Sequence, residues 1–170
     1  MENRKKFIVA IDQGTTSCRA ILFNTQVKSI FKSQLEFRQH FPKSGWVEHN
    51  PEEIWKTTKK VLLNAISKSK KLKGRILTIG ITNQRETTIL WDRITGKPVY
   101  NAIVWQDRRT ADFCKKYRSN KREKIINKKT GLLIDPYFSG TKIKWIIENV
   151  PKAKKRSEER RVGKECRSRW

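Results

Sequence analysis

Two short apolar runs joined by a polar turn, in residues 7–23, constrain the fold of this chain most strongly. The runs are too short for helices, so residues 6–12 and 18–24 are predicted to be two buried strands of a hairpin. The polar residues at and around the turn are Asp12, Gly14, Thr15, Thr16, Ser17 and Arg19. The sequence therefore predicts a β-sheet that begins with a hairpin and a polar tip.

A polar tip of this composition can bind a phosphate group and its metal ion. The Asp12 carboxylate can ligate Mg²⁺ directly or through water. Gly14 lets the backbone approach a phosphate, the next three residues offer hydroxyl and N–H donors, and Arg19 adds a fixed positive charge. An ordinary hairpin turn remains the alternative, because Asp, Gly, Thr and Ser all favour turns. Neither a Walker P-loop nor a Gly-x-Gly-x-x-Gly fingerprint is present.

The next segments predict a strand, a helix and a second buried strand. Residues 29–37 alternate in polarity as a third strand does. Asn50 is a good helix N-cap and Pro51 suits a first turn, so a helix is predicted from there through Ile66. Residues 74–82 form an apolar run predicted to be a buried strand, parallel to the first because a helix precedes it.

The remaining pattern predicts a mixed α/β fold. Residues 87–92 and 99–105 are predicted to be strands joined by a tight turn at 94–98. Helices are predicted over residues 107–117, 121–129 and 139–150. Strands and helices thus follow one another in an order that favours a mixed α/β sheet over an all-helical or all-β fold.

The charge of the chain is strongly positive, with 40 Lys and Arg against 16 Asp and Glu and a formal net charge of +24. Such an excess of positive charge is typical of proteins that bind nucleic acids. No RNA-binding aromatic signature, zinc finger or heptad repeat accompanies it. A Lys-rich solvated surface is the favoured interpretation, and a basic nucleic-acid-binding protein is kept as the alternative.

Cysteine and histidine usage predicts a reduced, zinc-free protein. Cys18, Cys114 and Cys166 are far apart and form no Cys-x-x-Cys pair. His40 and His49 lack a metal-ligand spacing, so both are expected to be ordinary surface or core residues. The first apolar run is too short for a signal peptide or a membrane span. We therefore expect a cytoplasmic protein without membrane insertion.

A second set of candidate residues follows predicted strands and can bind a small polar ligand. Adjacent Arg85 and Glu86 offer a donor and an acceptor suited to the hydroxyls of a polyol, or form a surface ion pair. Trp105 can supply an apolar wall for a ligand or be a core tryptophan. Tyr137 can reach a ligand hydroxyl, or its ring can anchor the loop.

Five segments together resemble the glycerol kinases, which belong to the FGGY carbohydrate kinases of the actin-like ATPase superfamily. The segments are Asp12–Ser17, Gly45–Pro51, Gly80–Thr88, Asn101–Thr110 and Asp135–Lys142. The resemblance covers residues 6 to about 150. Its Asn83–Thr87 block separates glycerol kinases from relatives that phosphorylate xylulose or gluconate.

The resemblance implies a ribonuclease-H-like α/β domain with a mixed sheet, truncated, and transfer of the ATP γ-phosphate to glycerol. The implied nucleotide ligands are Asp12, which would face Mg²⁺, and Thr15, Thr16, Ser17 and Arg19. The implied glycerol ligands are Thr15, Arg85, Glu86 and Tyr137, with Trp105 against the carbon chain. Another polyol or sugar remains an alternative substrate. The resemblance also allows a homo-oligomer for the full-length enzyme.

Two departures from the family pattern affect the expected activity. The family's general base is an aspartate in a downstream Gly-Asp-Gln segment, and neither this segment nor the adenine-binding second domain is present. We therefore expect residues 1–156 to be a partial N-terminal kinase domain with negligible activity alone. Residues 157–170 depart from the family and are expected to be a disordered or artefactual tail, from a frameshift or read-through.

Overall fold

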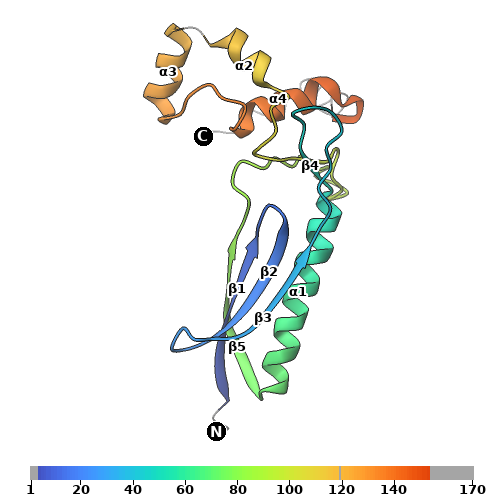
Figure 1. Cartoon of the computed structure of the whole chain (residues 1–170), viewed down its shortest axis with the longest axis vertical. Coiled ribbons are helices and arrows are strands. Elements are labelled where there is room, and N and C mark those ends of the chain that lie inside the picture. The colour runs from blue at the N-terminus through green and yellow to red at the C-terminus, as the bar shows by residue number, and fades with distance from the viewer. Residues whose placement is uncertain (1–3, 119, 154–170) are drawn as a thin grey trace. The chain divides into compact units, whose positions relative to one another are not determined.

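The computed structural model describes residues 4–118 and 120–153. The predicted tail at residues 157–170 lies outside these described residues. The chain divides into two compact units (Figure 1). The first unit combines Met1–His40 with His49–Arg85, and the second combines Phe41–Glu48 with the chain from Glu86 onward.

The first unit contains a four-stranded sheet in the order β3-β2-β1-β5. Strands β1 (Lys5–Gln13) and β2 (Ser17–Asn24) form the predicted antiparallel hairpin, and β3 (Ser29–Glu36) pairs antiparallel with β2. Strand β5 (Gly74–Thr82) pairs parallel with β1. The predicted hairpin, third strand and parallel fourth strand are all confirmed.

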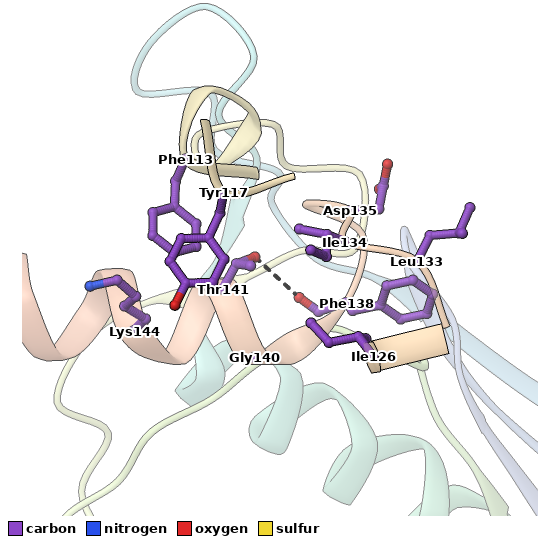
Figure 2. A pocket seen from close by; sticks show the side chains of 10 residues that line it. All are labelled: Phe113, Tyr117, Ile126, Leu133, Ile134, Asp135, Phe138, Gly140, Thr141 and Lys144. Atoms are coloured by element: carbon purple, nitrogen blue, oxygen red, sulfur yellow. Dashed lines mark hydrogen bonds between the residues drawn. The ribbon is translucent and has the colours of Figure 1, made fainter. Parts of the chain in front are cut away.

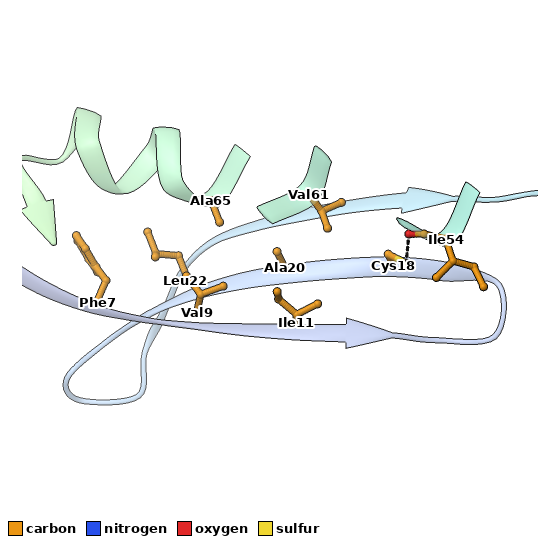
Figure 3. Close-up of a cluster of buried hydrophobic side chains, with 9 residues drawn as sticks. All are labelled: Phe7, Val9, Ile11, Cys18, Ala20, Leu22, Ile54, Val61 and Ala65. Atoms are coloured by element: carbon orange, nitrogen blue, oxygen red, sulfur yellow. Dashed lines mark hydrogen bonds between the residues drawn. The ribbon is translucent and has the colours of Figure 1, made fainter. Parts of the chain in front are cut away.

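Helix α1 (Pro51–Lys71) covers one face of this sheet and starts at the predicted cap. The Asn50 side chain accepts a hydrogen bond of 2.9 Å from the backbone N–H of Glu52, which satisfies an otherwise unpaired helix donor. Figure 3 shows apolar side chains of β1 and β2 facing those of the helix. This core consists of Phe7, Val9, Ile11, Cys18, Ala20, Leu22, Ile54, Val61 and Ala65.

Strand β5 is not buried, and this part of the prediction was wrong. It is the edge strand of the sheet among the described residues, and Ile79 and Ile81 are 43% and 69% exposed. The register pairs them with Val9 and Ile11, which are buried under α1. The apolar run was correctly assigned as a strand, but only its start, at Ile76, packs against the core, and the residues from Leu77 to Thr82 stay exposed at the edge.

The second unit contains little regular β structure, contrary to the two predicted strands. Strand β4 (Glu48–His49), where the chain crosses between the units, pairs with β6 (Ala102–Ile103). The remaining β pairing outside named strands consists of single bridges, Thr88 with Ile103 and Trp91 with Pro98. Polar side chains bond the backbone here and compete with strand pairing. The predicted tight turn is confirmed, since Asp92 accepts hydrogen bonds from the N–H groups of residues 94 and 95.

The described part of the second unit also contains three helices longer than one turn. They are α2 (Ala111–Tyr117), α3 (Asn120–Thr130) and α4 (Ser139–Asn149). The last two confirm the prediction. Helix α2 begins at Ala111 rather than Asp107, because the Asp107 carboxylate accepts hydrogen bonds from the backbone N–H groups of Val47 and Arg109 and holds this segment in a turn. No described helix has the combined length and apolar character needed to cross a membrane.

A buried arginine lies at the centre of the second unit. The Arg109 side chain is fully buried and forms ion pairs of 2.7 Å with Glu48 and 2.8 Å with Asp107. Its guanidinium carbon lies 3.9 Å from the ring centre of Trp46 and 4.5 Å from that of Trp145. We call these five residues the arginine cluster. Burial lowers the pKa of Arg109, but hydrogen bonds to the two carboxylates outweigh this effect, so its net pKa is raised and the cation is retained.

Candidate functional site

The predicted phosphate-binding residues lie together at the tip of the hairpin in the first unit. Asp12 and Arg19 are half-buried cross-strand partners, so their side chains leave the same face of the sheet. The Arg19 Nε atom is buried and lacks a hydrogen-bond partner among the described residues. A buried, unpaired guanidinium N–H is costly, and an anionic ligand would satisfy it.

The turn is closed by a hydrogen bond across it. The Gly14 N–H donates a 3.0 Å hydrogen bond to the Ser17 carbonyl, and a Cβ added at Gly14 would lie 3.1 Å from that oxygen. Glycine therefore helps to close the turn here, and the approach of its backbone to a phosphate stays a prediction. The Ser17 hydroxyl is buried and accepts a hydrogen bond from Gln34, whereas Thr16 is exposed. The Thr15 carbonyl accepts a 2.9 Å hydrogen bond from Gln39.

A divalent metal at this tip would depend on its nucleotide. Within the described ranges, no group of three or more His, Cys, Asp and Glu side chains is placed to hold a metal ion. Mg²⁺ is usually bound by one or two carboxylates, with phosphate oxygens and waters completing its shell. A single carboxylate at Asp12 fits that arrangement and does not fit an all-protein metal cage.

Three of the predicted polyol-binding residues come together in the second unit. The rings of Trp105 and Tyr137 meet edge to face, with centroids 6.1 Å apart. The buried Lys142 ammonium donates hydrogen bonds to the carbonyls of Glu86, at 3.1 Å, and Tyr137. Residues about fifty positions apart in sequence therefore share one small region.

Glu86 is held in place at both its backbone and its carboxylate. Its φ of 63° lies in the left-handed region, which is uncommon for a residue with a side chain. The carboxylate accepts hydrogen bonds from the N–H and hydroxyl of Ser139, at 2.9 and 2.8 Å. Ser139 is the first residue of α4, where the helix dipole favours an acidic partner. The arrangement fixes the Glu86 carboxylate as an acceptor, and Lys142 ties the backbone of Glu86 to that of Tyr137.

Sequence reasoning did not single out Ser139 or Lys142. Lys142 is 1% exposed, and burial lowers its pKa to about 8 although the charges of Glu86, Asp107 and Asp135 oppose the shift. The sequence does contain one indication that Lys142 is buried, because it lies one helical turn before the buried Ile146 on the same face of α4. A lysine on the apolar face of a helix needs polar partners inside the protein.

Arg85 is also predicted to bind the polyol. It is the last residue of the first unit, and it is exposed. Glu86 begins the second unit's longer segment. The pairing of these two residues at one ligand therefore stays a prediction.

A separate pocket of about 540 Å³ lies in the second unit between α2, α3 and α4 (Figure 2). Its lining is mostly apolar and consists of Phe113, Tyr117, Ile126, Leu133, Ile134, Asp135, Phe138, Gly140, Thr141 and Lys144. The Phe113 and Tyr117 rings stack with centroids 5.0 Å apart. None of Glu86, Trp105 and Tyr137 lines this pocket, so it does not coincide with the predicted polyol site.

Comparison with known proteins gives a family match. Residues 7–164 match the model of the N-terminal domain of the FGGY family of carbohydrate kinases. This range passes residue 156, where the sequence predicted the family pattern to end; the assignment of residues 157–170 stays a prediction.

Curated relatives are similar over most of this chain. It is 60% identical over 151 residues to a glycerol kinase of Rhizobium meliloti, a match covering 89% of this chain and 30% of that protein. It is 58% identical over 158 residues to a glycerol kinase of Parabacteroides distasonis, covering 93% and 32%. The chain thus spans about 30% of the length of the curated relatives it matches.

A solved structure supports the same relationship. The crystal structure of Plasmodium falciparum glycerol kinase with ADP superimposes with a TM-score of 0.86 at 37% sequence identity. The match covers 92% of this chain and 31% of that one. The mixed α/β architecture predicted from the sequence is therefore confirmed.

Proposed function

Because this chain belongs to the FGGY family of carbohydrate kinases, we propose that it forms part of an enzyme that transfers the γ-phosphate of ATP to glycerol. The observation that supports glycerol most directly is the fixed Glu86 carboxylate, together with the Lys142 ammonium that joins the Glu86 backbone to that of Tyr137 and the contact between the Tyr137 and Trp105 rings. A carboxylate acceptor and a phenol suit hydroxyl groups, and an indole face suits a short carbon chain.

The first unit would supply the contacts to the nucleotide. Arg19 and the N–H and hydroxyl donors of Thr15, Thr16 and Ser17 would face the phosphates, and Asp12 would hold Mg²⁺. The unpaired, buried Nε of Arg19 supports this assignment. Bound Mg²⁺ would neutralise phosphate charge, which is most of what phosphoryl transfer requires of its surroundings.

The second unit, with Arg85, would supply the contacts to glycerol. Arg85, Glu86 and Tyr137 would bind hydroxyls, and Trp105 would lie against the carbons. Thr15 is proposed as a further substrate-binding residue. The aspartate that deprotonates the attacking hydroxyl is expected outside residues 1–170. We therefore infer that the 170-residue chain binds glycerol without phosphorylating it.

Ligand binding and turnover by the purified chain test this proposal. Glycerol should raise the melting temperature of the chain, and Glu86→Ala should abolish the rise. Glu52→Ala, at an exposed position of α1, is the matched control and should leave the rise intact. Glycerol-dependent ADP release above that of an Arg85→Ala variant would show that the chain is active alone.

A chimaera tests the substrate. Residues 7–153 of this chain replace the matching segment of the Rhizobium meliloti glycerol kinase, to which the chain is 60% identical. Phosphorylation of glycerol in preference to xylulose and gluconate is the expected result. A folded chimaera that prefers a sugar would assign the chain to another polyol or sugar kinase of the family.

The net charge of +24 favours nucleic-acid binding as a second candidate. Salt-dependent binding to DNA, without a response to glycerol, would support it. A cytoplasmic location is proposed on the cysteines, because Cys18 and Cys114 are free thiols, as expected in a reducing compartment.

A further inference from the structure

A chain of hydrogen bonds in the first unit connects the hairpin turn to the end of β5. The Gln39 side-chain amide donates to the Thr15 carbonyl at 2.9 Å. The Gln39 side-chain oxygen lies 2.6 Å from Nε2 of His49, and Nδ1 of His49 lies 3.4 Å from the side-chain nitrogen of Gln84. The imidazole ring therefore bridges two glutamines from different parts of the unit.

The direction of these hydrogen bonds is fixed by the chemistry of the two amides. An amide oxygen only accepts, so His49 must donate from Nε2 to Gln39. An amide nitrogen donates, so Nδ1 must accept from Gln84. The hydrogen bonds thus run in one direction, from Gln84 through His49 and Gln39 to Thr15, and they require the neutral Nε2–H form of the ring.

The surroundings of His49 favour that neutral form. The ring is fully buried and meets Phe37 edge to face, with centroids 5.0 Å apart. Burial lowers the pKa of His49 to about 4, with a further lowering from His40 and an opposing effect from Glu53. A neutral imidazole, with one donor and one acceptor on opposite sides, satisfies both amides without bringing a charge into the core.

We propose that His49 is a positioning residue that holds the Thr15 turn and the Gln84–Arg85 segment in register. The inference rests on the proposed function, in which Thr15 faces the phosphates and Arg85 binds the polyol. Loss of the imidazole would remove the side-chain link between Gln39 and Gln84 and leave the pairing of β1 with β5, which ends at Asp12 and Thr82, to hold the two segments. Errors of about 1 Å between reacting groups lower rates by roughly a hundredfold, so a rigid link between them matters for catalysis.

Nuclear magnetic resonance on the 170-residue chain tests the link itself. We expect the imidazole ¹⁵N signals of His49 to show the neutral Nε2–H form at pH 7. His49→Phe keeps a ring against Phe37 but removes both hydrogen bonds. It should shift the amide signals of Thr16, next to the Thr15 carbonyl, and of Arg85. Unchanged signals at both positions would overturn the proposal.

A matched variant separates positioning from packing. Phe37→Leu disturbs the ring contact and leaves the hydrogen bonds in place, so it should alter stability without shifting both Thr16 and Arg85. His49→Gln keeps an amide near the Nε2 position and His49→Asn keeps one near Nδ1. Each should therefore restore the signal at one end of the link only.

Kinetics of the chimaera test the consequence for the reaction. His49→Phe should lower kcat/KM by about tenfold or more at an unchanged folded fraction. A loss no greater than that of Phe37→Leu would make His49 an ordinary core residue and overturn the proposal. If the unaltered chimaera folds but does not phosphorylate glycerol, the proposed function fails, and the resonance experiment still decides whether the link exists.

Discussion

The two units of this chain are stabilised in different ways. The core of the first unit is hydrocarbon, enclosed between a regular sheet and one long helix. The second unit has a small apolar cluster of Ile103, Ile146, Val150 and Ala153, and beside it the charged and aromatic arginine cluster. The difference follows from the backbone, because regular elements pair their own polar groups and irregular segments do not.

Carboxylates pair the backbone donors of the second unit. Among the described residues, five acidic side chains of this unit accept hydrogen bonds from backbone N–H groups: Glu86, Asp92, Asp107, Asp135 and Glu123. The bonds to the first four are short, between 2.7 and 2.9 Å, and the bond from Ile134 to Glu123 is 3.4 Å. A charged acceptor is stronger than a neutral one, so a few side chains replace a sheet ladder. Because carboxylates pair these backbone groups, negative charge is buried in the second unit, and the positive charges of Arg109 and Lys142 balance it.

The largest expected effect is loss of the arginine at the centre of the second unit. Arg109→Met would leave Glu48 and Asp107 buried without their cation, which typically costs about 3–5 kcal/mol in the free energy of unfolding. Urea unfolding followed by tryptophan fluorescence measures it, because Trp46, Trp105 and Trp145 all lie in this unit.

The neighbouring residue supplies the control for that measurement. Arg108 pairs with Asp135 at 3.6 Å, but its side chain is 58% exposed. Arg108→Met should therefore cost no more than about 1 kcal/mol. Equal losses for the two variants would show that the ion pairs of Arg109 do not determine the stability of this unit.

A cavity in the first unit should have the next largest effect. Leu22 is fully buried against α1, and Leu22→Ala should cost about 3 kcal/mol through lost burial and the cavity left behind. Leu63, on α1, is 52% exposed, so Leu63→Ala should change the free energy by about 0.5 kcal/mol or less. Urea unfolding followed by far-ultraviolet circular dichroism is the measurement. A loss below 1 kcal/mol for Leu22→Ala would contradict a close-packed core.

The same contrast explains what the sequence could predict. In the first unit, polarity alternation, an Asn-Pro cap and an apolar run specified every strand and the helix with small boundary errors. In the second unit, residues 87–105 have strand-like composition, but the Asp92 turn and the left-handed backbone at Glu86 interrupt the pairing. Such interruptions depend on side-chain to backbone hydrogen bonds, which a periodicity does not reveal.

The residues of the candidate site also form two groups, those that could be identified from the sequence and those that could not. Residues on short motifs, such as Asp12, Glu86, Trp105 and Tyr137, could be selected from the sequence by chemistry and position. Ser139, Lys142 and His49 could not, because their roles depend on burial or on partners 35–56 positions away in the sequence. Whether the selected residues bind ATP and glycerol remains a prediction for the experiments above.

Acid should weaken the first unit through His49 by a moderate amount. The folded-state pKa is about 4, below the ordinary value of 6.5, so the unfolded chain binds the proton more readily. The stability is therefore complete above pH 6.5 and is lost as the pH falls towards 4, by about 2 kcal/mol at pH 5. Urea unfolding at pH 7 and pH 5 measures the loss of stability. In the His49→Phe variant this loss should be smaller by about 2 kcal/mol. An identical pH dependence in the variant would exclude His49 as the source.

The smallest expected effect concerns the uncovered edge of the first unit. Ile11 and Ile81 are register partners on β1 and β5, yet they are 3% and 69% exposed. Ile11→Ala should therefore cost about 2–5 kcal/mol, whereas Ile81→Ala should stay within about 0.5 kcal/mol. The two variants make the same change on the same face of the sheet, at Ile11 under the helix and at Ile81 where no helix covers the strand. A cost above 1 kcal/mol at Ile81 would mean that β5 is covered in solution, and its dependence on protein concentration would show whether a second copy covers it.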